Sequence, residues 1–368
     1  MPKQKHTSES VTEGHPDKVC DYIADSILDA HIAEDKKSRV ACEVLCKNNT
    51  VVLAGEITSG AKVDLCDIVR QVVKEIGYTD NSELFSADNL QIIQLLSPQS
   101  AELGGVVNPD SKINKEQGAG DQGIMFGYAT DETPELMPLP ILLAHRLSKG
   151  LAEDRKSDRI KWLRPDGKTQ VSVVYDDSKP IRVSDVLVST QHAKGIENDE
   201  IEQYVKGDLM PKVLGEWHND DIKVTVNPSG SFIQGGPSAD SGLTGRKNIV
   251  DTYGGAAHHG GGSFSGKDPS KVDRSATYFC RYVARQIVLK GIARRVEVQV
   301  SYAIGIAKPF SLNVNCFGTG DEEEAIEFLT GFDFRPASII NELNLLRPIY
   351  RKTTNYGHFG RSGLPWEE

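Results

Sequence analysis

Glycine in this chain is gathered into three short segments, and those segments limit what the rest of the chain can build. The 368 residues include 34 glycines, which concentrate at 118–127, 235–245 and 254–266. Glycine loses more conformational freedom on folding than any other residue, so dense runs are costly unless the backbone must turn sharply or approach something closely. We therefore expect loops, rather than helix or strand faces, to approach a ligand.

Between the glycine runs, helix and strand patterns alternate without a regular βαβ rhythm. Helices are expected over 17–33, 63–76, 272–287 and, in shorter segments, near 196–214. Strands are expected over 90–96 (a buried one), 124–128, 170–175, 222–226 and 296–304. Two further strands over 40–57 flank Asn48-Asn49, which favours a two-residue hairpin turn. The mixture predicts α+β domains with largely antiparallel sheets.

Length and charge exclude several classes of protein. At roughly 100–200 residues per domain, the length predicts two or three domains. The 42 basic and 52 acidic side chains give a net charge of −10, which argues against nonspecific binding to nucleic acid. No segment approaches the roughly 20 apolar residues of a membrane helix. The N-terminus does not resemble a signal peptide, and none of the six cysteines forms a CxxC pair. We expect a cytoplasmic protein that binds neither membranes nor nucleic acid.

The first glycine run contains a formal GxGxxG pattern at 118–123. A dinucleotide-binding motif needs a strand before the pattern and a helix after it. Here the preceding residues 113–117 are polar and a strand pattern follows, so that interpretation is disfavoured. The alternative is a tight turn that allows close backbone approach, with Asp121 at its tip.

The run at 260–274 is more informative. Residues 261–267 nearly spell a phosphate-binding loop, but Asp268 stands where a serine or threonine is required. Pro269 is expected to begin a helix with Asp268 as its N-cap, and a loop that leads into a helix N-terminus binds anions. Positive charge would come from Lys267, Lys271 and Arg274, and Asp273 could bind a metal that bridges phosphates. The alternative is a capped helix with solvated lysines.

The run at 235–247 has the same kind of composition: glycines, a single acidic residue, Asp240, and the basic pair Arg246-Lys247. Alone it could be a surface loop, but three such segments in an acidic chain favour a polyphosphate ligand. Acidic and basic residues also crowd the start of the first helix around His15 and Asp17. Asp17 could join Asp273 in a cation site, or it could merely complement the helix dipole.

The hairpin gives a geometric prediction. With a two-residue turn at Asn48-Asn49, Glu43 faces Ala54 and Glu56 faces Ala41. The two carboxylates are then diagonal neighbours on one face, roughly 7–8 Å apart by Cα. They could hold a cation or an ammonium group, or they could lie on a solvated sheet face.

Several motifs together resemble those of the bacterial-type S-adenosylmethionine synthetase (methionine adenosyltransferase) family. They are EGHPDK at 13–18, GAGDQG-x-MFGYAT at 118–130, GLTGRK at 242–247, GGG-x-FSGKDPSKVDRS at 260–275 and YGHFGR at 356–361. The resemblance implies attack of the L-methionine sulfur on C5′ of ATP, followed by hydrolysis of the released triphosphate to pyrophosphate and phosphate. Two other functions stay open: an ATP-dependent phosphotransferase, which would produce ADP, and a non-catalytic regulatory homologue.

The resemblance also implies an architecture. It predicts three related α+β domains with pseudo-threefold symmetry and mixed, largely antiparallel sheets covered by helices. The domains would span 3–100, 115–233 and 234–366, with a mobile active-site loop at 99–115. Members of the family are homo-oligomers, typically tetramers built as dimers of dimers, with each active site between two subunits. Their cofactors are Mg²⁺, expected at two ions per site, and K⁺.

Site residues follow from matching positions in the motifs. The residues expected to be catalytic are His15, Lys168, Lys247 and Lys267. The ATP site would add Asp166, Phe232, Asp240, Arg246 and Ser263. Methionine would be held by Glu56, Gln99, Asp121, Asp240 and Lys271. Asp17 and Asp273 would bind Mg²⁺, and Glu43 would support K⁺.

Two positions depart from the family pattern. Ser231 stands where members usually carry an arginine before Phe232, so one cationic contact is expected to be absent. The segment after Gln99 reads SAEL, where bacterial members commonly have a Ser-Pro-Asp-Ile-like run. Because that segment would be the lid, we expect the change to affect turnover rate rather than chemistry.

Overall fold

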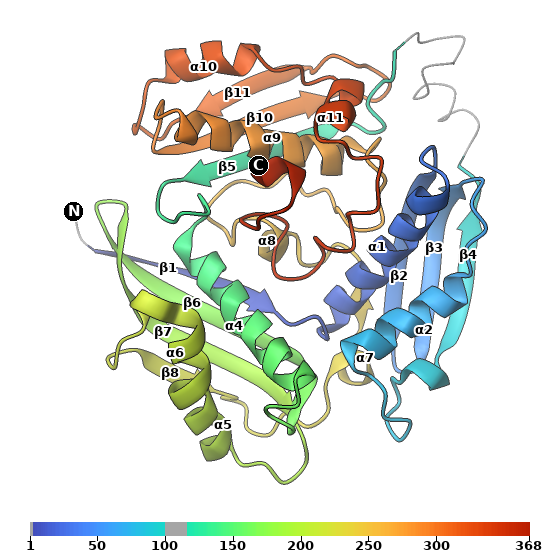
Figure 1. Ribbon diagram of the computed structural model, residues 1–368, viewed down its shortest axis with the longest axis vertical. Coiled ribbons are helices and arrows are strands. Elements are labelled where there is room, and N and C mark those ends of the chain that lie inside the picture. The colour runs from blue at the N-terminus through green and yellow to red at the C-terminus, as the bar shows by residue number, and fades with distance from the viewer. Residues whose placement is uncertain (1–2, 100–115) are drawn as a thin grey trace.

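The computed structural model describes residues 3–99 and 116–368, which form three sheets with helices packed on them (Figure 1). The first sheet has the order β1 (Gln4–Val11), β6 (Leu163–Asp176), β7 (Lys179–His192) and β8 (Lys223–Val226). The second has the order β9 (Gly242–Leu243), β2 (Arg39–Lys47), β3 (Thr50–Thr58) and β4 (Gln91–Ser97). The third has the order β5 (Gly123–Thr130), β10 (Arg295–Tyr302) and β11 (Ser311–Asn315).

The three sheets share one plan. Each contains an antiparallel hairpin, and a strand from a distant part of the chain pairs antiparallel with the first strand of that hairpin. In the first two sheets a final strand runs parallel to the second hairpin strand. Most pairings are therefore antiparallel, as predicted.

The long helices connect the sheets in a cycle. Helix α1 (Pro16–Glu34) follows β1 of the first sheet and packs on the second. Helix α9 (Val272–Leu289) follows β9 of the second sheet and packs on the third. Helix α4 (Leu139–Lys156) follows β5 of the third sheet and packs on the first. These steps close a threefold cycle, which confirms the predicted α+β class and pseudo-threefold relation (Figure 1).

The remaining elements are shorter. They are α2 (Leu65–Ile76), α5 (Asn198–Tyr204), α6 (Met210–Leu214), α7 (Gly236–Ala239), α8 (Asn248–Asp251), α10 (Glu322–Thr330) and α11 (Pro336–Glu342). Single turns lie at η1 (Ala87–Asn89), η3 (Gly215–Trp217) and η4 (Pro365–Glu367), and η2 (Val205–Leu209) is a π-helical turn. Across residues 3–99 and 116–368, no helix has the length and apolar character needed to cross a bilayer.

The hairpin register agrees with the sequence prediction. Asn48 takes a positive φ of 51° at the turn between β2 and β3. Glu43 pairs with Ala54, and Glu56 pairs with Ala41, so both carboxylates leave the same face of the second sheet.

Two predictions of local structure were wrong. Strand β4 was expected to be buried, yet Leu95 on its outer face is 63% exposed, because β4 is an edge strand and no helix covers that face among the described residues. The predicted helix start at Pro269 lies too early, since α9 begins at Val272. Asp268 is no N-cap, because its N–H donates to the Val40 carbonyl and its carboxylate accepts the Val40 and Ser270 N–H groups at 2.8 and 2.9 Å. These contacts hold residue 268 against β2 instead.

Candidate functional site

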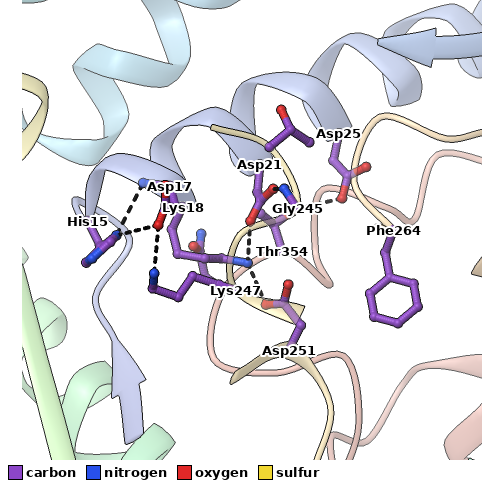
Figure 2. Close-up of polar contacts among 12 residues, drawn as sticks. His15, Asp17, Lys18, Asp21, Asp25, Gly245, Lys247, Asp251, Phe264 and Thr354 are labelled. Carbon is purple, nitrogen blue, oxygen red and sulfur yellow. Dashed lines mark hydrogen bonds and ion pairs between the residues drawn. The ribbon is translucent and has the colours of Figure 1, made fainter. Parts of the chain in front are cut away.

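A group of charged residues converges at the start of α1 (Figure 2). Asp17, in the first turn, accepts a hydrogen bond from the Lys247 Nζ at 2.7 Å and from the Leu243 N–H at 3.0 Å. The Arg246 Nε lies 3.7 Å from the same carboxylate. Gly242 permits this approach, since a Cβ there would stand 2.1 Å from the Pro16 carbonyl oxygen. The start of α1 thus holds the basic pair of the glycine run at 235–247.

His15 is the N-cap of α1, and its Nδ1 accepts the Asp17 N–H at 3.2 Å. Burial of the ring, together with the charges of Lys247 and Lys168, lowers the pKa of His15 to about 2. The ring is therefore neutral at physiological pH, and the hydrogen bond to Nδ1 assigns the proton to Nε2. His15 can donate a hydrogen bond from Nε2 without carrying a charge.

Strand pairing brings Lys168 to this corner, because Val11 at the end of β1 pairs with Lys168 on β6. Asp166, on the same strand, accepts the Gly236 N–H at 2.8 Å, while its buried Oδ1 has no hydrogen-bond partner. Burial raises the pKa of the Asp166 carboxyl to about 6. Phe232 is fixed at the end of β7, the strand that pairs with β6, since its N–H donates to the His192 Nε2 at 3.0 Å. We call the following residues the first group: His15, Asp17, Asp166, Lys168, Phe232, Asp240, Arg246 and Lys247.

A second group lies along β2 and the loop before α9. The Lys267 Nζ lies 2.7 Å from the Asp273 carboxylate, and the backbone of Lys267 bridges Ala41 on β2. Glu43 lies two residues further along β2, and Glu56 is the pairing partner of Ala41. The members of the second group are Glu43, Glu56, Gln99, Asp121, Lys267, Lys271 and Asp273.

The GxGxxG segment is a tight turn, as the preferred alternative predicted. The Gly120 N–H donates to the Ser270 carbonyl at 3.2 Å, and a Cβ on Gly118 would lie 2.4 Å from the Gly305 carbonyl oxygen. The turn presents Asp121 next to the loop that carries Lys271.

Several predicted site residues contact other groups of the protein. Arg274, expected to supply charge for an anion, is fully buried and paired with Asp25 at 2.6 Å, so it is not available to a ligand. Lys271 is paired with Asp268. Ser263 lies against Gly245, with its Oγ buried and unpartnered. Of the expected loop at 99–115, only Gln99 belongs to the described residues, and its N–H donates to the Thr58 Oγ1 at 2.9 Å.

The two groups are not joined within one chain. In the part of the chain that the structure describes, no hydrogen bond or ion pair links a member of the first group to a member of the second. Asp17 and Asp273, the two predicted Mg²⁺ ligands, fall in different groups, and each faces a lysine at 2.7 Å. Residues 3–99 and 116–368 hold no cluster of three or more histidine, cysteine or carboxylate ligands suited to a metal.

Three aspartates beyond Asp17 on α1 are not among the residues predicted for the site. Asp21, Asp25 and Asp29 continue its spacing of four residues, a signal that the sequence contained.

Family models for the three domains of S-adenosylmethionine synthetase match this chain: the N-terminal domain at residues 3–101, the central domain at 116–232 and the C-terminal domain at 234–368. The chain is 52% identical to the S-adenosylmethionine synthase of Sorangium cellulosum, over 100% of this chain and 88% of the relative. It is 53% identical to that of Akkermansia muciniphila, over 98% and 94%, and 54% identical to that of Thermus thermophilus, over 98% and 95%.

Proposed function

This chain belongs to the S-adenosylmethionine synthetase family, and on that premise we propose that it joins ATP and L-methionine by attack of the sulfur on C5′. The bound triphosphate is then hydrolysed to pyrophosphate and phosphate. The observation that carries the proposal is the geometry at the start of α1: His15 caps the helix next to Asp17, Arg246 and Lys247 lie against the Asp17 carboxylate, and strand pairing brings Lys168 to the same corner. Cations next to a neutral hydrogen-bond donor stabilise the negative charge that develops on a departing polyphosphate.

The chemistry asks little acid or base work from the protein. A thioether is a neutral nucleophile, so catalysis consists of alignment and stabilisation of the charge on the leaving triphosphate. The Nε2–H of His15 donates to the oxygen that leaves C5′, and the lysines of both groups bind the phosphates. The unpartnered Oδ1 of Asp166 fits a ribose hydroxyl, and the ring of Phe232 fits the adenine.

Two carboxylates suit the metal that the family implies. Mg²⁺ prefers carboxylate and phosphate oxygens, and Asp17 and Asp273 offer the carboxylates once their lysines turn to the phosphates. Bound there, Mg²⁺ would neutralise phosphate charge, and Glu43 would support K⁺. We assign methionine to Glu56, Gln99, Asp121, Asp240 and Lys271.

The state of Asp166 gives a pH dependence. Because its pKa is about 6, the carboxylate gains a proton as the pH falls from 7 to 5 and becomes a weaker acceptor for the ribose hydroxyl. The KM for ATP should therefore rise severalfold over that range, whereas the KM of Asp166→Asn should be higher at pH 7 and nearly flat. Steady-state kinetics at saturating Mg²⁺ test this, and an equally steep rise in the variant would contradict it. His15 does not titrate in this range.

The separation of the two groups indicates that one active site is shared by two subunits. The open face of the second sheet carries Glu43 and Glu56 next to exposed apolar side chains from three of its strands, β2, β4 and β9. These side chains are Leu45, Ile93, Leu95 and Leu243. Exposed apolar clusters of this kind mark interaction surfaces. We propose a homodimer formed through this face, which brings the first group of one subunit to the second group of its partner, and two such dimers in a tetramer.

A charge on this face should separate the subunits. Leu95→Asp places a carboxylate in the proposed interface, and we expect it to shift the molecular mass in solution to that of a monomer and to abolish turnover. Leu289→Asp is the control, because Leu289 is 60% exposed but lies at the end of α9, away from the sheet face. Sedimentation analysis of both variants measures their oligomeric state. A Leu95→Asp protein that sediments like wild type would refute the interface.

A product assay tests the reaction itself. With ATP, methionine, Mg²⁺ and K⁺, we expect one S-adenosylmethionine, one pyrophosphate and one phosphate per turnover. ADP would indicate a phosphotransferase. Tight ATP binding without turnover would indicate a regulatory homologue.

A further inference from the structure

One face of α1 carries aspartates at every fourth residue, and each accepts backbone N–H groups from a distant segment. Asp17 holds Leu243, Asp21 holds Gly245 and Asp25 holds Gly266, at 3.0, 2.9 and 2.9 Å. Asp29 holds Tyr350 and Arg351 at 3.0 and 2.9 Å. Figure 2 shows the first three aspartates following one another along the helix.

This arrangement is electrostatically expensive. Like charges four residues apart destabilise a helix, and both Asp21 and Asp25 are fully buried. Each is paired with a buried cation: the Lys18 Nζ lies 3.1 Å from Asp21, and Arg274 makes two bonds to Asp25 at 2.6 and 2.8 Å. Such pairs add little net stability compared with apolar packing, so their value lies in the geometry that they impose.

Asp25 and Arg274 clamp the loop that carries Lys267. Asp25 accepts the Gly266 N–H, while the guanidinium of Arg274 donates to the carbonyls of Phe264 and Lys267 at 2.9 and 3.3 Å. One ion pair therefore bonds the backbone on both sides of Lys267, in addition to the pairing of this loop with β2.

Asp21 fixes the other basic loop. It accepts the N–H of Gly245, the residue directly before Arg246 and Lys247. Lys18 ties Asp21 to Asp251, at the end of α8, with a bond of 2.6 Å to the Asp251 carboxylate (Figure 2). The segment 245–251 is thus anchored at both ends to α1.

We propose that Asp21 and Asp25 are positioning residues for the reaction, Asp21 for Arg246 and Lys247 and Asp25, with Arg274, for Lys267. This inference rests on the proposed function. Both aspartate side chains are fully buried, so they set the phosphate-binding cations through the loops and do not contact the substrate themselves. Asp29 has the same helix face and spacing but holds Tyr350 and Arg351, in a segment that carries none of the proposed phosphate-binding cations, so it provides a matched control.

The test is a crossed double-mutant cycle on kcat. Asp21→Asn and Asp25→Asn should each lower kcat by roughly 10²-fold, because misplacing a catalytic group by about 1 Å has that effect, with little change in the KM for methionine. Asp29→Asn should stay within about twofold of wild type. Added to Lys247→Ala, Asp21→Asn should lower kcat little further, whereas added to Lys267→Ala it should lower kcat by its full factor. Asp25→Asn should lower kcat little further in Lys267→Ala and by its full factor in Lys247→Ala.

Two outcomes would overturn the inference: full additivity in all four combinations, or a loss of kcat in Asp29→Asn equal to that of the other two. If Asp25→Asn does not fold, Arg274→Lys takes its place, because lysine keeps the charge but cannot bond Asp25 and both carbonyls together.

Hydrogen exchange separates this inference from the proposed function. Asp21→Asn should speed amide exchange at 243–247, and Asp25→Asn at 264–268, whatever reaction the protein performs. A wild-type protein that makes no S-adenosylmethionine but shows this exchange pattern would remove the proposed function and keep the positioning. If the wild type is active but the variants show neither faster amide exchange nor coupling in kcat, the positioning role is refuted and the proposed function stands.

Discussion

Replacing Lys267 by alanine is expected to lower kcat by roughly 10²–10³-fold, the usual cost of removing one group that stabilises charge in a transition state. The Nζ of Lys267 faces Asp273 at 2.7 Å, and the loop backbone around it is bonded to Asp25 and Arg274. The free energy of unfolding should change by only about 1 kcal/mol, because the lost pair is partly solvated. Rates of S-adenosylmethionine formation and urea unfolding measure the two effects.

Lys149→Ala is the control for loss of a lysine. Lys149 lies on α4, and its contact is an exposed ion pair with Glu153 at 3.7 Å, so neither turnover nor stability should change. Near-normal turnover in Lys267→Ala would remove the assignment of this lysine to the phosphates.

Replacing Arg274 by alanine is expected to lower the free energy of unfolding by about 3–5 kcal/mol, because it leaves Asp25 buried without its cation. The variant also loses the stacking of the guanidinium on Tyr350, 4.3 Å from the ring centre, and two bonds to loop carbonyls. Urea unfolding at neutral pH measures the loss. A variant within about 1 kcal/mol of wild type would show that the pair is not a structural requirement.

The double variant Asp25→Leu/Arg274→Met separates stability from function. Well-packed apolar pairs often replace buried ion pairs, so this protein should recover most of the stability that Arg274→Ala loses, less the cost of the backbone groups left without partners. Its turnover should stay low, because the loop around Lys267 keeps its backbone pairing with β2 but loses its bonds to Asp25 and Arg274. A double variant that is both stable and fully active would contradict the clamp.

Local patterns in the sequence predicted local structure well. The helices near 17–33, 63–76 and 272–287 and the hairpin register at Glu43 and Glu56 depend on periodicity and one turn, and they are confirmed. The start of α9 was placed wrongly because Asp268, a good N-cap by sequence, is instead bound to Val40 on β2. A contact between residues as far apart in the chain as Val40 and Asp268 leaves no local pattern in the sequence.

The same limit applies to the candidate site. Motifs indicated which residues belong to it, and the turn around Asp121 followed from polar flanks and a strand pattern. The burial of Arg274 could not be predicted, because an arginine close to two lysines in the sequence suggests a basic surface. Its partner Asp25 lies on α1, far away in the chain. Nor did the sequence indicate that β1 would pair with β6 and so place Lys168 beside His15.

The most direct test is a mixed dimer of Lys247→Ala and Lys267→Ala subunits, purified through two different tags and assayed for S-adenosylmethionine. Each variant alone should be nearly inactive. If an active site takes its first group from one subunit and its second group from the partner, the mixed dimer contains one site with both lysines, and it should regain about half of the wild-type turnover. A mixed dimer as inactive as its parents would place both lysines in a site within one chain and contradict the shared site.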